Sequence, residues 1–312
     1  MNLQKKIGSL VAILSIVPTI SAAPSWFTLL TDTETGEGFN RCGASLVYPD
    51  VVMATSECGF FGTYARVGYR DNYDSDHVTR LDYKRSHPSK GQVNGRPMET
   101  FPNDIELYKL KKPVRGVEPI KLYEGGMGLD DNNAHPLYFA QAGSKEDVWD
   151  PPQKDVPKGD QPDAWSLHKF GFGEHPVSSL KEGSVSLEEF RLCSKHIQDL
   201  PGYNPKIDQK LVFCTNASPN SPCDTMAWGS PLYSNETRTG ETVLVGMASQ
   251  GMCDPAGVPY INVRIAHYVN WIKGAICSMT DTQHDVIDCS TVDTNVQYWS
   301  RDVEEFGPFT PK

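Results

Sequence analysis

Short runs of apolar residues recur along the chain, and turn-forming residues separate them. Gly (26) and Pro (23) are plentiful, which favours short strands joined by turns over long helices. This density of strand-like runs predicts an all-β sandwich or barrel. The runs are SWFTLL (25–30), ASLVY (44–48), VVMAT (51–55), YARVGYR (64–70), IELYKL (105–110), HPLYFA (135–140), HKFGFG (168–173), GSVSLEEF (183–190), KLVFC (210–214), VLVGMAS (243–249) and YINVRI (260–265).

One segment near the end has the period of a helix instead. In RIAHYVNWIKGAI, apolar residues recur at steps of three and four and form a single stripe: Ile265, Tyr268, Val269, Ile272 and Ile276. Such a helix is expected to pack its stripe on the β core.

The first 23 residues have the pattern of a secretory signal. Lys5 and Lys6 precede an apolar run, and the small residues Ala22 and Ala23 offer a cleavage site. A membrane anchor is the alternative, but the run is short, contains Pro18, and no other segment approaches the roughly 20 apolar residues of a membrane span. We therefore expect export as a secreted protein with no membrane partner.

Two further segments differ from the rest. Residues 143–164 are acidic and Pro-rich, which predicts an exposed loop. Residues 277–312 form a polar C-terminal extension. The formal charge of the chain is −10, and removal of Lys5 and Lys6 with the signal changes it to −12. Such an acidic protein repels phosphate backbones, so nucleic acid is not an expected partner.

The eight cysteines are even in number, which in an exported chain suggests disulfides. No CxxC pair occurs, so structural zinc is not expected. The sequons NAS at Asn216 and NET at Asn235 predict a glycoprotein, although sequons also arise by chance.

Four stretches, in order, resemble motifs of the trypsin/chymotrypsin-like serine protease family (peptidase S1). CGASLVYPDVVMATSEC is similar to CGGSLI…WVLTAAHC, and NDIELYKLKKPV to NDIALLKLKKPV. CDTMAWGSPL is similar to CxGDSGGPL, and LVGMASQGMCDPAGVPYINVRIAHYVNWI to LVGIVSWGxxC…PGVYTRVxxYxxWI. The resemblance covers roughly residues 25–276.

The resemblance implies two six-stranded antiparallel β-barrels with a site between them, formed by a domain over residues 24–276. It also implies that the acidic loop falls between the barrels. The implied disulfides are Cys42–Cys58, Cys193–Cys214 and Cys223–Cys253, which leaves Cys277–Cys289 to hold the extension.

Two of the three catalytic positions of the family hold other residues in this chain. Glu57 occupies the place of the general-base His in AAHC, and a carboxylate with an ordinary pKa near 4.3 is a much weaker base than imidazole. Trp228 occupies the place of the Ser in GDSGGP, and an indole has no nucleophilic oxygen. Asp104 matches the triad Asp in NDIELYKL and is interpreted as a structural acid.

The surroundings of these positions have changed as well. Met226 stands where the oxyanion-hole Gly is expected, and Ala227 stands where the family has the Asp that binds a new N-terminus. The pocket-equivalent residues are Ser221, which carries no charge, and Ser249 and Gly251, which flank Gln250 in SQG. No R-IVGG activation site precedes SWFTLL.

Three alternatives remain open at this stage. A Glu57–Asp104 pair could share a proton or bind a cation, but no third ligand is visible, so neither a metal nor a cofactor is expected. An active serine-type endopeptidase would need a rebuilt site, and none of the candidate histidines lies in a catalytic motif. These are His87, His168, His175, His196 and His267. A structural or storage protein is the third.

The sequence therefore predicts a secreted serine protease homologue without catalytic activity, a pseudoenzyme that binds an extracellular protein as an inhibitor, decoy or cofactor. The oomycete glucanase inhibitor proteins, in which the same scaffold has lost its triad, are one similar group. This comparison is an analogy at the level of the fold.

Overall fold

The computed structural model describes the two sheets, the C-terminal helix and part of the extension. The described residues are 24–36, 41–56, 58, 62–70, 74–88, 103–125, 137–143, 179–198, 207–216, 228–235, 241–250, 259–281 and 284–292. No helix in this described part of the chain is long and apolar enough to cross a membrane.

The first sheet is a closed six-stranded barrel in the order β1-β2-β3-β6-β5-β4, and each neighbouring pair is antiparallel. Every residue of β1 and β3 is buried, which agrees with the continuous apolar runs in those segments. The strands are β1 (Phe27–Thr31), β2 (Arg41–Tyr48), β3 (Val51–Ala54), β4 (Tyr64–Val67), β5 (His77–Ser86) and β6 (Glu106–Leu110).

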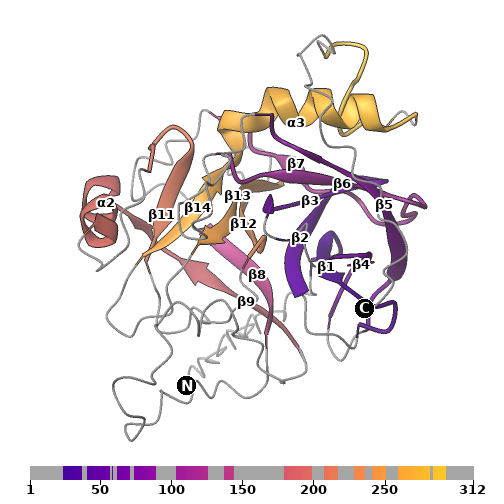
Figure 1. Cartoon of the computed structure of the whole chain (residues 1–312), viewed down its shortest axis with the longest axis horizontal. Helices are drawn as coiled ribbons and strands as arrows, with labels where there is room; N and C mark the ends of the chain where they lie inside the picture. The colour runs from indigo at the N-terminus through magenta and orange to yellow at the C-terminus, as the bar shows by residue number, and fades with distance from the viewer. Residues whose placement is uncertain are drawn as a thin grey trace, which may run out of the picture.

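The second sheet contains eight strands in the order β10-β11-β14-β13-β12-β8-β9, with β7 paired to β13. Two of these, β7 and β10, have only two residues each, so six longer antiparallel strands form the body of the sheet. The strands are β7 (Lys121–Leu122), β8 (Leu137–Gly143), β9 (Ser179–Val185), β10 (Leu187–Glu188), β11 (Val212–Thr215), β12 (Pro231–Asn235), β13 (Thr242–Gln250) and β14 (Tyr260–Arg264). Figure 1 shows the two sheets side by side, and the all-β, two-barrel prediction is confirmed.

Helix α3 (Ile265–Met279) follows β14 directly and spans from the second sheet to the first barrel (Figure 1). All five residues of its predicted stripe are buried. At its C-terminal end the Tyr83 hydroxyl donates to the Met279 carbonyl oxygen over 3.2 Å. The Thr280 hydroxyl donates to Oδ2 of Asp50 over 2.9 Å, and the Lys109 ammonium binds the same oxygen. The helix therefore fastens one sheet to the other.

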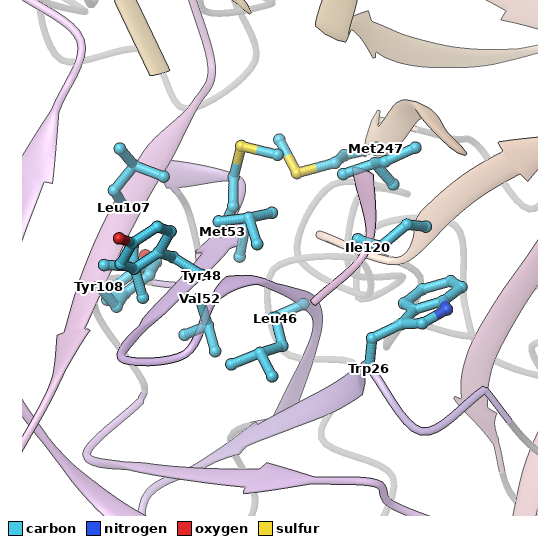
Figure 2. Close-up of a cluster of buried hydrophobic side chains, with 14 of the residues drawn as sticks. Trp26, Leu46, Tyr48, Val52, Met53, Leu107, Tyr108, Ile120 and Met247 are labelled. Carbon is cyan, nitrogen blue, oxygen red and sulfur yellow. The ribbon is translucent and has the colours of Figure 1, made fainter. Parts of the chain in front are cut away.

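The main hydrophobic core is shared by both sheets. It contains most of the buried residues of the first barrel together with Met247 of β13 and the buried face of α3. Figure 2 shows the side chains of Met53 (β3) and Met247 (β13) pointing toward one another. This continuity fixes the two sheets relative to each other and hence fixes the site between them.

Three sequence-based expectations need correction or addition. The sequence pattern did not reveal β5, whose partly exposed residues include many charges, or helix α2 (Phe190–Gln198). Phe190, Cys193 and Ile197 recur at helical spacing, but only Cys193 and Ile197 are buried, so the apolar stripe is narrow.

The acidic loop, residues 143–164, was expected to connect the two barrels, and this expectation is wrong. The loop follows β8 and precedes β9, which are paired neighbours within the second sheet.

Three of the four expected disulfides are present in the described residues: Cys42–Cys58, Cys193–Cys214 and Cys277–Cys289. The fourth, Cys223–Cys253, lies outside them. Cys277 belongs to the last turns of α3, so its disulfide holds the extension against the end of that helix. Ile287 of the extension is 4% exposed and joins the main core.

Candidate functional site

Asp104 lies between the two sheets and is 2% exposed. Its Oδ1 accepts a hydrogen bond from the Ser56 backbone N–H over 2.8 Å and another from the Ser56 hydroxyl over 2.5 Å. Its Oδ2 accepts a hydrogen bond from the Ser249 hydroxyl. Both carboxylate oxygens are therefore engaged by donors, as a buried charge requires.

The backbone around Asp104 is shaped to point this carboxylate inward. Asn103 has φ 64°, a left-handed conformation that Asn tolerates better than most residues. The Ile105 N–H donates to the Asn103 carbonyl oxygen over 2.8 Å, which closes a tight turn at Asp104. The Tyr268 hydroxyl of α3 donates to Oδ1 of Asn103 over 3.3 Å, so the helix supports the turn from outside.

Ser249 reaches Asp104 because of a bulge in β13. The register between β13 and β14 shifts between Ala248 and Gln250, so Ser249 is the extra residue. A β-bulge re-aims a side chain, and bulges are over-represented beside functional sites. Ser249, one of the pocket-equivalent residues, is 3% exposed, and its bond to Asp104 ties the second sheet to the first.

Ser56 is held by the segment that ends at the first disulfide. The Cys58 N–H donates to the Thr55 carbonyl oxygen over 3.1 Å, and Cys58 is joined to Cys42 of β2. In the aligned motifs Ser56 stands where TAAHC has its second Ala. Ser56 was not among the predicted site residues, although the motif comparison displays the change from Ala to Ser.

Trp228 begins the turn that enters β12. Its side chain is half-buried and packs against the main core. Its carbonyl oxygen accepts a hydrogen bond from the Gly43 N–H of β2 over 2.9 Å. The next residue, Gly229, donates its N–H to the carbonyl oxygen of Ala248, the neighbour of Ser249, over 2.8 Å. The turn therefore lies against both sheets, next to the residues that bind Asp104.

Two glycines make this close approach possible. Gly229 has φ +73°, and a Cβ there would lie 2.1 Å from the Gly43 carbonyl oxygen. A Cβ on Gly43 would lie 2.6 Å from the Cα of Ser230. Side chains at either place would force the turn away from β2, so both positions require glycine. Ser230, the serine nearest to Trp228 in the sequence, is 2% exposed.

A half-buried histidine lies on the α3 side of the same region. The backbone N–H of His87 donates to the Ile105 carbonyl oxygen over 3.3 Å. The His87 ring lies 5.4 Å from the Tyr268 ring and 5.0 Å from the Trp271 ring. Burial lowers the pKa of His87 to about 4, with a smaller contribution from His267. Burial also raises the pKa of Tyr268, and the Asp104 charge adds to that increase. At neutral pH His87 is therefore a weak base.

No family model matches the sequence. A comparison with solved structures finds mouse neuropsin, described as a serine protease expressed in the limbic system of mouse brain. Its sequence identity is 20% and its TM-score is 0.56, and the match covers 82% of this chain and 96% of the neuropsin chain.

The chain has the trypsin-like fold. At this level of identity the similarity establishes the fold, and the chemistry has to be argued from the residues. Asp104 binds Ser249 of the second sheet, and the turn that bears Trp228 contacts both sheets. The assignment of Asp104 and Trp228 to catalytic positions of the family stays a prediction from the motif comparison.

The remaining predicted site residues divide into two groups. Asn216 and Asn235 are exposed at the ends of β11 and β12, where a glycan could be carried. Glu57, Ser221 and Gly251 lie outside the described residues. A Glu57–Asp104 cation site therefore stays a hypothesis. The described neighbours of Asp104, Ser56 and Ser249, present hydroxyl donors to it rather than anionic ligands.

Proposed function

We propose that this chain is a secreted, catalytically inactive protein of trypsin-like fold that acts by binding an extracellular protein, as an inhibitor, decoy or cofactor. The observation that carries the proposal is the position of Trp228. The turn that bears it is fixed to β2 through Gly43 and to β13 through Ala248, the neighbour of Ser249, and its half-buried indole packs against the main core. The carbon and N–H groups of an indole cannot attack a carbonyl carbon.

The described serines near Asp104 do not offer a replacement nucleophile. Ser56, Ser230 and Ser249 are 1%, 2% and 3% exposed. The hydroxyls of Ser56 and Ser249 donate to the Asp104 carboxylate, so each is committed to a structural bond. A substrate carbonyl could not reach any of them without opening the interface between the sheets. An active endopeptidase with a rebuilt site is therefore the weaker candidate.

Export is supported by the disulfides. Three bridges in one chain are typical of proteins that fold in oxidising compartments. Together with the signal-like residues 1–23 and the exposed sequon residues Asn216 and Asn235, they support secretion as a glycoprotein.

Hydrolysis assays test the inactive half of the proposal. The chain, purified from an oxidising expression host, is incubated with a broad mixture of peptide and ester substrates beside active trypsin. We expect no turnover above the buffer blank. Saturable hydrolysis that a serine-protease inhibitor abolishes would contradict the proposal.

Affinity capture tests the binding half. The immobilised chain is exposed to the native extracellular fluid, and the bound proteins are then titrated individually. We expect a protein that binds saturably to the folded chain and not to the reduced, unfolded chain. If no extracellular protein binds the folded chain, the binding role is wrong even if the chain is inactive.

A further inference from the structure

A surface hollow of about 540 Å³ lies on the first barrel and is separate from the Asp104 site. Three segments form its walls: the β2–β3 turn with Pro49, residues 113–118, and His284 of the C-terminal extension. Its volume is within the range of known ligand pockets. Pro49, Pro113, Val114 and Val117 give it an apolar lining.

The walls of the hollow are held by specific contacts. The Val114 N–H donates to the Pro49 carbonyl oxygen over 2.7 Å, which joins two of the three segments. The His284 ring packs edge-on against Tyr48 at 5.8 Å, and its Nδ1 accepts from the Val286 N–H over 3.3 Å. The Cys277–Cys289 disulfide retains this part of the extension. The hollow is therefore preformed, which reduces the entropic cost of binding.

A short run of exposed cations reaches the hollow along one of its walls. Arg115 lines the hollow together with Glu118, and Lys111 and Lys112 directly precede the lining residue Pro113. Lys111, Lys112 and Arg115 are exposed and form no ion pair within the described residues. The neighbouring lysines differ, because Lys109 binds Asp50 and Lys121 binds Glu241. In a chain with a net charge of −10, three such cations within five residues form a local basic surface on an otherwise acidic protein.

We propose that this hollow binds a short acidic peptide segment of a partner protein. Carboxylates of the segment would pair with Lys111, Lys112 and Arg115, and an apolar side chain would rest on the Pro and Val lining. The apolar lining favours a segment that carries an apolar side chain as well as carboxylates over a polysulfated chain, which has no apolar side chain to place there. The inference rests on the proposed function, since it names the kind of partner and the surface that binds it.

A labelled peptide of sequence Glu-Glu-Leu-Pro-Glu-Glu, blocked at both ends, is the direct probe. Fluorescence anisotropy should detect saturable binding to the full chain, and the affinity should fall with added salt, which screens exposed charges. The peptide Gln-Gln-Leu-Pro-Gln-Gln should bind at least tenfold more weakly. Equal binding of the two peptides would overturn the proposal.

Charge reversal locates the site. The triple variant Lys111→Glu, Lys112→Glu, Arg115→Glu should weaken binding of the acidic peptide at least tenfold. The matched variant Arg191→Glu, Lys195→Glu, Lys210→Glu reverses three exposed cations of the second sheet region and should leave the affinity unchanged. An equal loss in both variants would mean nonspecific attraction and would overturn the proposal. Hydrogen exchange of residues 111–118 should slow on binding, and unchanged exchange there would also contradict it.

A shortened variant that ends at Val292 tests whether the chain's own C-terminal tail occupies the hollow instead of a partner. It lacks residues 293–312, which carry Asp302, Glu304 and Glu305 next to apolar residues. If only this shortened chain binds the peptide, the hollow belongs to the chain's own tail and the partner assignment is wrong. Heparin that competes as strongly as the acidic peptide would likewise overturn the assignment. Peptide binding at the hollow is measured independently of hydrolysis. A failure of the peptide-binding proposal can therefore be distinguished from a failure of the proposed function.

Discussion

Ser56 donates two hydrogen bonds to one oxygen of Asp104, through its backbone N–H over 2.8 Å and its hydroxyl over 2.5 Å. The aligned family motif has Ala at this place, which has no hydroxyl to donate. In this chain a serine therefore satisfies a buried carboxylate that the motif comparison assigns to a triad position. Asp104 acts here as a structural acid that joins the two sheets through Ser56 and Ser249.

The first prediction is that Ser56→Ala destabilises the fold. The variant removes a hydrogen bond to a buried charge, and such bonds contribute about 1.5–3 kcal/mol. Chemical denaturation should therefore show a loss of about 1.5–3 kcal/mol in the free energy of unfolding.

Ser45→Ala is a matched control for this loss. Ser45 is fully buried in β2, and its hydroxyl has no hydrogen-bond partner among the described residues. Removal of an unsatisfied hydroxyl should be neutral or stabilising. Equal losses in the two variants would show that the Ser56–Asp104 bond contributes nothing specific.

The second prediction is that restoring two residues does not restore an enzyme. Glu57→His with Trp228→Ser supplies the missing base and nucleophile beside Asp104. The Ser56 hydroxyl still occupies Oδ1 of Asp104, and Met226 still replaces the oxyanion-hole Gly. Loss of even one oxyanion donor costs roughly 10²–10³ in rate. We expect no detectable peptide hydrolysis in a continuous fluorogenic assay. Clear, inhibitor-sensitive activity of the double variant would mean that the cleft is better preserved than proposed.

Much of the fold could be predicted because it depends on local patterns. The continuous apolar runs of β1 and β3 and the stripe of α3 are direct consequences of which side chains are buried. Strand β5 was not predicted because its exposed face carries charges in place of a regular apolar alternation. Helix α2 was not predicted because it buries only two residues.

The candidate site was only partly predictable. Asp104 and Trp228 could be found by motif comparison, but the partners of Asp104 depend on long-range geometry. Ser249 reaches it through a bulge in β13, and a single sequence carries no signal for that register shift. Likewise, the acidic loop was assigned to the wrong connection because strand pairing between β8 and β9 is not a local property.

The third prediction concerns how the stability of the fold depends on pH. Burial holds the pKa of His87 at about 4 in the folded chain, below the ordinary 6.5, so His87 is neutral when folded and takes up a proton on unfolding. Its contribution to stability is complete above pH 6.5 and is lost as the pH falls from 6.5 toward 4. The difference in Tm between the wild type and His87→Phe should therefore change across this window.

The control for the acid effect is His196→Gln, which alters an exposed residue of α2. This variant should follow the wild-type pH profile of Tm. If His87→Phe also follows that profile, His87 is not the group that responds to acid in this window.

The fourth prediction concerns the anchor of α3. Asp50 binds both the Lys109 ammonium and the Thr280 hydroxyl, and the side chains of Asp50 and Lys109 are 4% and 15% exposed. Breaking a largely buried pair by changing one partner costs about 3 kcal/mol. Asp50→Asn should show that loss in chemical denaturation. Glu241→Gln breaks an exposed pair with Lys121 and should cost less than about 1 kcal/mol. Similar losses in the two variants would argue against Asp50 as an anchor.

The most direct test of the central claim is labelling of the purified chain by a fluorophosphonate probe, which reacts only with activated serine hydroxyls. The motif comparison assigns Trp228 to the nucleophile position, and Ser56, Ser230 and Ser249 are buried. We predict that intact-mass spectrometry will find no adduct under conditions that label trypsin completely. Stoichiometric labelling of any serine would contradict the account and identify a working nucleophile.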